Sequence, residues 1–217
     1  MNYFKYTILF LLIILNTGCS KDDNVDDFPE FELSTPDEFS DEDYKVYSSF
    51  LEQYNTPNVV VSQESSEENF ASAFTETTED DFWVKKNLES RYPDFEASLF
   101  TKLIEVNLKT KFFDDKFSVN NKMITLITEP ELTYISELSK TNTYENLEGF
   151  WDYFYKIHPQ SQGYVSLSLI SYSENKDQAV FEIWNACGGL CGDGGFVYCR
   201  KENGVWTFID AFLLVAA

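Results

Sequence analysis

Hydrophobic and polar positions in the first half of the chain follow a helical period. Apolar residues stand at positions 46, 47, 50, 51 and 54, and this spacing predicts a helix over residues 43–51. Ser40 is placed to cap that helix, because Asp43 follows three residues later, as in a capping box. Residues 79–107 predict two more helices, interrupted at Pro93.

Shorter elements are predicted from local sequence patterns in the same way. Residues 58–62, NVVVS, are rich in β-branched side chains and predict a strand, and residues 123–127, MITLI, predict a strand or one arm of a hairpin. Residues 146–154 predict a short aromatic helix. The N-terminal half is therefore expected to be mainly helical.

From residue 163 onward the period changes to two, which is typical of half-buried β-strands. Four runs follow one another: YVSLSLISYS, QAVFEIWNAC, GFVYCRK and VWTFIDAFLLV. The last two are joined by Asn203-Gly204, a favoured hairpin pair. Helices first and strands last predict the α+β class, with a helical N-terminal half packed against a C-terminal antiparallel four-stranded β-meander.

The first residues, MNYFKYTILFLLIILNTGC, predict export rather than part of the fold. Their apolar core is about ten residues long, which suits a signal peptide and falls short of the roughly 20 residues of a membrane span. A small residue before Cys19 resembles the lipobox of bacterial lipoproteins, although Asn16 stands where a leucine is usual. We therefore expect a signal peptide over 1–18 and acylation of Cys19 as a membrane anchor; the alternative is an ordinary signal peptide.

Negative charge is concentrated directly after this cysteine. The net charge is −21, and residues 20–43 hold eleven acids against one lysine. With few apolar residues, the stretch 19–43 is predicted to be a disordered acidic tether, and 44–217 a single domain. No basic stripe is present in the sequence, so nucleic acid is not expected as a partner.

The tether also predicts a location. Its first residues, SKDDNVDD, resemble the surface-export signal of lipoproteins from Bacteroidota. The expected location is therefore the outer membrane, lipid-anchored and on the cell surface, with the periplasmic face as the alternative.

The C-terminal half carries a pattern that is similar to a family of uncharacterised bacterial lipoproteins and secreted proteins of the Bacteroidota type. The pattern consists of Trp151, Phe154, Pro159, Gly163, Ser166, Ser168, Asp177, Ala179, the run CGGLCG from Cys187 to Gly192, Asn203, Gly204 and Trp206. The resemblance covers the last 70 residues or so and implies the fold and the cell-envelope location. It implies no activity, catalytic residue or cofactor.

Three of the four cysteines lie in the run NACGGLCGDGGFVYC. If the flanking strands pair around a turn centred near Cys191, Cys187 faces Gly195 and Cys199 faces Ile183, about 13 Å further along the strand. That distance is too long for a bridge, so Cys187 and Cys191 are expected to form a disulfide in an oxidising compartment. A zinc site or a dithiol redox motif are the less favoured alternatives.

Candidate binding residues come from the aromatic content, which is 17% of the chain. Trp184, Tyr198 and Trp206 alternate along the predicted meander and are candidates for a sugar- or peptide-binding platform, although a core role is the more common one. The single histidine, His158, gives no catalytic pattern by itself. The sequence therefore predicts a lipid-anchored, non-catalytic accessory or binding protein with a possible glycan or protein partner; the alternative is an exported hydrolase or thiol-dependent enzyme.

Overall fold

The computed structural model describes residues 28–66, 82–141 and 147–216. The part of the chain that begins at Phe31 forms one compact unit. Its elements are α2 (Asp41–Leu51), β1 (Asn58–Ser62), α4 (Phe82–Arg91), α5 (Ser98–Val106), β2 (Met123–Ile127), α6 (Glu129–Thr141), α7 (Phe150–Ile157), β3 (Tyr164–Leu167), β4 (Ser171–Tyr172), β5 (Gln178–Gly188), β6 (Cys191–Glu202) and β7 (Val205–Ala216).

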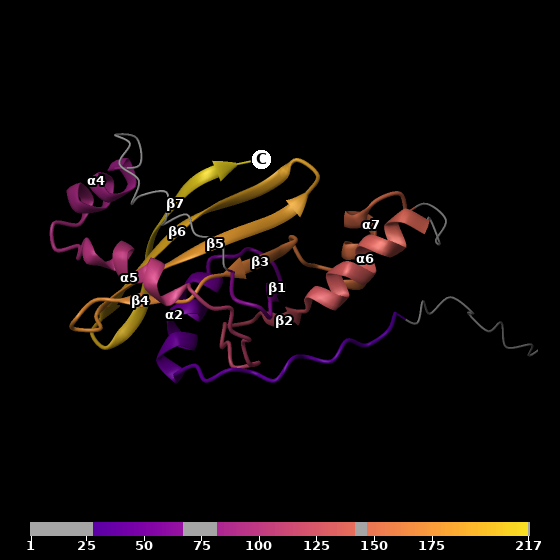
Figure 1. Cartoon of the computed structure of the whole chain (residues 1–217), viewed down its shortest axis with the longest axis horizontal. Helices are drawn as coiled ribbons and strands as arrows, with labels where there is room; N and C mark the ends of the chain where they lie inside the picture. The colour runs from indigo at the N-terminus through magenta and orange to yellow at the C-terminus, as the bar shows by residue number, and fades with distance from the viewer. Residues whose placement is uncertain (1–27, 67–81, 142–146, 217) are drawn as a thin grey trace, which may run out of the picture. The chain divides into compact units, whose positions relative to one another are not determined.

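A single seven-stranded sheet organises this unit (Figure 1). The strand order is β2-β1-β3-β5-β6-β7, and the short strand β4 also pairs with β5. The strand β1 is parallel to both β2 and β3, whereas β5, β6 and β7 form an antiparallel meander. The sheet is therefore mixed.

The predicted fold class is wrong. The C-terminal strands form the expected antiparallel meander, but β1 and β2 extend the same sheet from the N-terminal half. Val59, Val60 and Val61 of β1 are all buried, because helices or loops cover the strand on both faces. Three consecutive valines are the pattern of a parallel strand inside a sheet, and the fold is mixed α/β.

The helix α2 covers one face of the sheet. It begins at Asp41 after Ser40, whose hydroxyl accepts from the backbone of Asp43, while the Asp43 carboxylate accepts from the backbone of Ser40. The capping box therefore forms as predicted. Val46, Tyr47, Phe50 and Leu51 of this helix are buried against the sheet with a set of odd-numbered strand residues: Val165, Leu167, Ala179, Phe181, Ile183, Val197 and Cys199.

The chain before this helix is partly ordered by contacts with the unit. Ser34 donates its backbone N–H to Oε1 of Gln63 at 2.9 Å, and Asp37 donates its own to the carbonyl of Phe112 at 2.9 Å. The expected boundary between tether and domain was residue 43. In the described residues, hydrogen-bonded structure starts about ten residues earlier, and residues 19–27 lie outside the described part of the chain.

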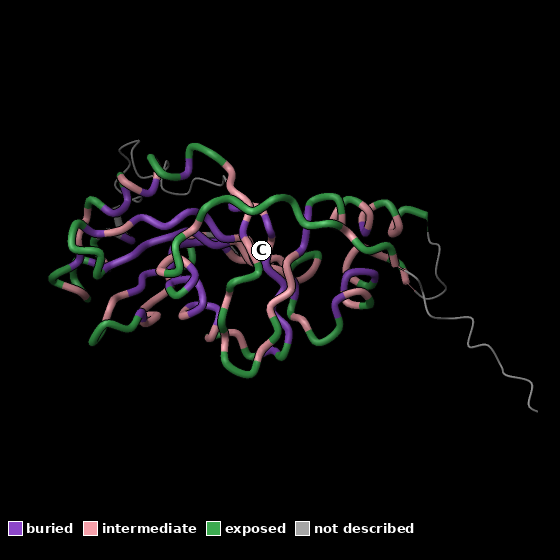
Figure 2. Tube along the Cα trace, turned by 90° about the horizontal axis from the view of Figure 1, so that it is seen from below, coloured by how far each residue is buried: buried purple, intermediate pink, exposed green. Residues whose placement is uncertain are grey.

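Two helical pairs cover the other face. The helices α4 and α5 pack on Val180, Phe196, Tyr198 and Phe212, and α6 and α7 pack on β1 and β2 through Val60 and Ile127. Figure 2 shows the buried residues running along the strands, while the loops and the outer sides of the helices are exposed. The sheet therefore forms the middle layer of three.

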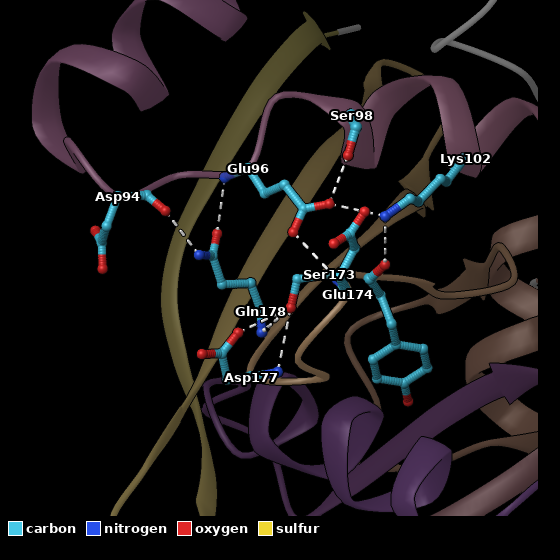
Figure 3. Close-up of polar contacts among 9 residues, drawn as sticks. Asp94, Glu96, Ser98, Lys102, Ser173, Glu174, Asp177 and Gln178 are labelled. Atoms are coloured by element: carbon cyan, nitrogen blue, oxygen red, sulfur yellow. Dashed lines mark hydrogen bonds and ion pairs between the residues drawn. The ribbon is translucent and has the colours of Figure 1, made fainter.

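A polar network fixes α5 to the turn before β5 (Figure 3). Gln178 is 8% exposed and is its centre: its Oε1 accepts from the backbone N–H of Glu96 at 3.0 Å, and its Nε2 donates to the carbonyl of Asp94 at 2.7 Å. Oε1 also accepts from the hydroxyl of Tyr198. We call this group, with Ser98, Lys102, Ser173 and Asp177, the Gln178 network.

Candidate functional site

The far end of the β5–β6 hairpin is closed by a disulfide between Cys187 and Cys191, whose Cα atoms are 5.1 Å apart. The expected bridge is therefore confirmed. The register that led to it is wrong by four residues along the strand: Gly195 faces Ile183 and not Cys187, and Cys199 faces Ala179 and not Ile183. The turn lies at residues 189–190, so the two bridged cysteines flank a tight hairpin.

The disulfide forms part of the wall of a cavity of about 310 Å³. The cavity lies where the start of β3, the start of β1 and the segment after α2 meet the end of the hairpin. Gly163 permits this approach: its φ is +95°, and a Cβ there would collide with the carbonyl oxygen of Ala186. We call this cavity the disulfide pocket; its described lining is Tyr54, Thr56, Asn58, Val59, Val60, Gln162, Gly163, Tyr164, Val165, Asn185, Cys187, Cys191 and Asp193.

Three side chains in this wall form a hydrogen-bonded chain. The hydroxyl of Tyr54 donates to Oδ1 of Asn185, and Nδ2 of Asn185 donates to Oδ1 of Asp193 at 2.6 Å. The order follows from chemistry, because an ionised carboxylate only accepts, so the amide turns its nitrogen toward Asp193. Burial raises the pKa of Tyr54, and the negative charge of Asp193 raises it further, so the phenol keeps its proton.

A second hollow adjoins the first and shares part of its wall. Its volume is about 380 Å³, and Tyr54, Gln162, Asn185 and Asp193 line both cavities. The added wall comes from apolar side chains of α2, β5 and β7, such as Phe50, Ile183 and Phe208. Together they form a mainly apolar cavity with a few convergent polar groups, the composition of many ligand sites.

The predicted aromatic platform does not form one surface. Tyr198 is fully buried under α4 and α5, and Trp206 is 5% exposed and packs on the opposite face of the sheet. Trp184 is half-buried and lies on the same face as Tyr198. Side chains alternate between the two faces of a strand, and both faces of this sheet are covered. The rings therefore pack in two different cores and do not form one exposed platform.

Catalytic groups are not gathered at the pocket. Cys199 is buried, and burial raises the pKa of its thiol to about 12, which keeps it protonated. Nε2 of His158 lies 2.9 Å from Oε1 of Glu131, and the two side chains are only 7% and 13% exposed. That pair joins α6 to α7 on the other face of the sheet. Within the described residues, no group of three or more His, Cys, Asp or Glu side chains is placed to hold a metal ion.

The predicted anchor residue, Cys19, and the signal peptide over 1–18 lie outside the described residues. Among the helices that the structure describes, none is long and apolar enough to cross a bilayer. Comparison of the chain with protein-family models, curated proteins and solved structures gave no match. The family resemblance and the expected location therefore stay predictions.

Sequence reasoning found the bridge but missed the pocket beside it. Tyr54 comes after the predicted first helix, and Asn185 and Asp193 flank the CGGLCG run. The register that places Asn185 opposite Asp193 was available only from the correct turn position. Two polar residues that flank a cysteine pair, one on each arm of a hairpin, are the signal that could have indicated the site.

Proposed function

We propose that the protein is a lipid-anchored, non-catalytic binding protein of the outer-membrane surface, and that the disulfide pocket is its ligand site. The observation that carries the proposal is the chain of Tyr54, Asn185 and Asp193 in the wall of a preformed cavity. The cavity combines concavity with convergent polar groups, which are the usual marks of a ligand site.

The disulfide supports both halves of the proposal. Disulfides persist in oxidising compartments, which agrees with an exported protein. The bridge also holds the hairpin end that carries two of the three polar wall residues, so the pocket is rigid before a ligand arrives. Pre-organisation of this kind reduces the ordering cost of binding.

The rival reading, an exported hydrolase or thiol-dependent enzyme, has weaker support. A thiol enzyme needs a thiolate, whereas Cys187 and Cys191 are bridged and Cys199 is buried with a raised pKa. A hydrolase with His158 as its base needs that ring to face a substrate, and it faces Glu131 inside a helix layer.

The anchor is tested by growing cells with a clickable fatty acid and recovering the protein. We expect label on the wild type, none on Cys19→Ala, and normal label on Cys199→Ala as the matched cysteine control. Digestion of intact cells with an external protease should remove the labelled protein. Label retained on Cys19→Ala would contradict the anchor, and full protection from protease would contradict the surface location.

The pocket is tested by a ligand-observed NMR screen of a polar fragment library against the purified protein. Gln162 is exposed at the pocket wall, so Gln162→Trp should fill the pocket without disturbing the core. Lys140→Trp, an exposed change on α6, is the matched control. Hits lost in Gln162→Trp and kept in Lys140→Trp support the proposal; hits unaffected by Gln162→Trp, or no hits at all, contradict it.

A further inference from the structure

We infer that the disulfide pocket takes a ligand that carries a protonated amino group, with Asp193 as its counter-ion. The inference rests on the proposed function, since it names the class of ligand for the same site. It follows from the direction of the hydrogen bonds in the pocket wall and from the charge of the groups that line it.

Several protons of the wall are used by hydrogen bonds within the protein. The hydroxyl proton of Tyr54 is used by Asn185, and one amide proton of Asn185 is used by Asp193. The hydroxyl of Thr56 donates to the carbonyl oxygen of Gln160, with the carbonyl oxygen of Asn58 3.2 Å from the same hydroxyl, and Oδ1 of Asn58 accepts from the hydroxyl of Thr125. Toward a ligand the wall offers acceptors, among them the second carboxylate oxygen of Asp193 and the lone pairs of Tyr54 and Thr56, beside the amide donors of Asn58, Gln162 and Asn185. The charge of Asp193 therefore decides the class of ligand.

The charge in the wall of the disulfide pocket is negative. Asp193 is the one ionisable acid in the described lining, and no basic side chain appears among those lining residues. Across the described residues Asp193 forms no ion pair, and its hydrogen bond is to a neutral amide. A half-buried carboxylate whose partner is a neutral amide is complementary to a cation, and a charge-assisted hydrogen bond is stronger than a neutral one.

The size of the cavity narrows the class of ligand. An ammonium supplies three donors, which the Asp193 carboxylate and the neighbouring acceptors can share. The volume of about 310 Å³ lies at the lower end of known ligand pockets, so the cavity suits a small molecule or the end residue of a chain. The net charge of −21 also favours the approach of a cation over an anion.

The test compares each amine with its acetylated partner by titration calorimetry at about pH 6, where both amines are protonated. The probe pairs are glucosamine with N-acetylglucosamine, and alaninamide with N-acetylalaninamide. We expect acetylation to weaken binding about tenfold or more, because it removes the charge that Asp193 binds. Binding of glucosamine alone would assign an amino sugar, and binding of alaninamide alone would assign an amino-acid or peptide N-terminus.

The variant Asp193→Asn should weaken the free amines about tenfold or more and leave the acetylated partners unchanged. Glu137→Gln, an exposed acid on α6, is the control for the loss of one negative charge and should bind like the wild type. The comparison of amine with acetylated probe on the wild type does not depend on how well the variant folds.

Two outcomes would overturn the inference and leave the proposed function standing. One is equal binding of the amine and its acetylated partner; the other is no binding of either pair while Gln162→Trp still abolishes fragment hits. Loss of the fragment hits themselves, or their insensitivity to Gln162→Trp, would overturn the proposed function instead. The two failures are therefore distinguishable.

Discussion

The two ends of the strand β5 carry an amide each, and the two amides are used differently. Gln178 at the start is 8% exposed and bonds to Asp94, Glu96 and Tyr198, so both ends of its amide have protein partners. Asn185 near the other end also has protein partners at both ends of its amide, Tyr54 and Asp193, but it is half-buried and lies in the wall of the disulfide pocket. The first amide is enclosed by the protein, and the second borders a cavity.

This difference separates structural polar groups from candidate functional ones. In the Gln178 network, each acceptor and donor contributes to holding α5 on the sheet (Figure 3). In the pocket, the same residue types leave a carboxylate oxygen and hydroxyl lone pairs without a described protein donor. The two polar clusters therefore differ in how many hydrogen-bonding groups they leave without a protein partner, and a ligand can use those groups.

The largest expected effect comes from removing each of the two amide side chains in turn. Gln178→Ala should lower the free energy of unfolding by about 3 kcal/mol, since it leaves the N–H of Glu96 and the hydroxyl of Tyr198 without partners in a dry site. Asn185→Ala should cost only about 1 kcal/mol, because water can enter the pocket. Urea denaturation measures both, and equal costs would remove the distinction between the two ends.

Removal of the disulfide comes next. The double change Cys187→Ser and Cys191→Ser should cost at most about 2 kcal/mol, because the bridge closes a very short loop. The free energy of fragment binding should fall by more than the free energy of unfolding, since the hairpin end that holds Asn185 and Asp193 becomes mobile. Adding reductant to the wild type should reproduce both changes, and the Ser double variant should not respond to reductant. Unchanged binding in either case would show that the bridge does not support the pocket.

A smaller effect is expected at Glu96 in the Gln178 network. The ammonium of Lys102, 2.7 Å away, and the hydroxyl of Ser98 lower the pKa of Glu96 from 4.5 to about 2. The stabilisation from its ionised form is therefore complete above about pH 4.5 and is lost as the pH falls toward 2.

The measurement compares Glu96→Gln with the wild type by denaturation across this pH range. The variant should be about 1 kcal/mol less stable at neutral pH, as for a half-exposed ion pair, and the difference should vanish near pH 2. A difference that stays constant with pH would show that the hydroxyl and backbone contacts of Glu96, rather than its charge, carry the effect.

The smallest expected effect on stability is that of Gln162→Trp in the wall of the disulfide pocket. Gln162→Trp changes an exposed side chain, so its midpoint of thermal unfolding should match that of the wild type, with a free-energy change below about 0.5 kcal/mol. Its loss of fragment binding should nevertheless be complete. A large loss of stability would mean that the wall is part of the core and not an open site.

The elements were largely predictable from the sequence, and their assembly was not. The strands β1 and β2 have the predicted bounds, 58–62 and 123–127, because short β-branched and apolar runs mark them locally. Which strands pair is a long-range property, and the parallel contact of Val60 with Tyr164 joins residues about one hundred positions apart. The helix α6 was not predicted, although Pro130 lies in its first turn, where proline is tolerated.

In the candidate site too, local features were predictable and long-range contacts were not. Cys187 and Cys191 were paired by a register that excluded Cys199, and the pairing holds although the register is wrong, because a sequence separation of four brings them together in almost any register. Tyr54 and Asn185 are 131 residues apart, and only the packing of α2 on β5 brings them within hydrogen-bonding distance. Tyr198 and Trp206 were misread as surface residues because one sequence does not say how many faces of a sheet are covered.

The central claim is that the ligand site lies at the disulfide end of β5 and not at the Gln178 end. The most direct test is a map of backbone amide NMR shifts on the purified protein with the strongest binder from the fragment screen. We expect the shifts to gather at residues 54–58, 162–165 and 185–193, with residues 94–98 and 173–178 unchanged. Shifts centred on the Gln178 network, or no localised shifts at all, would contradict the account.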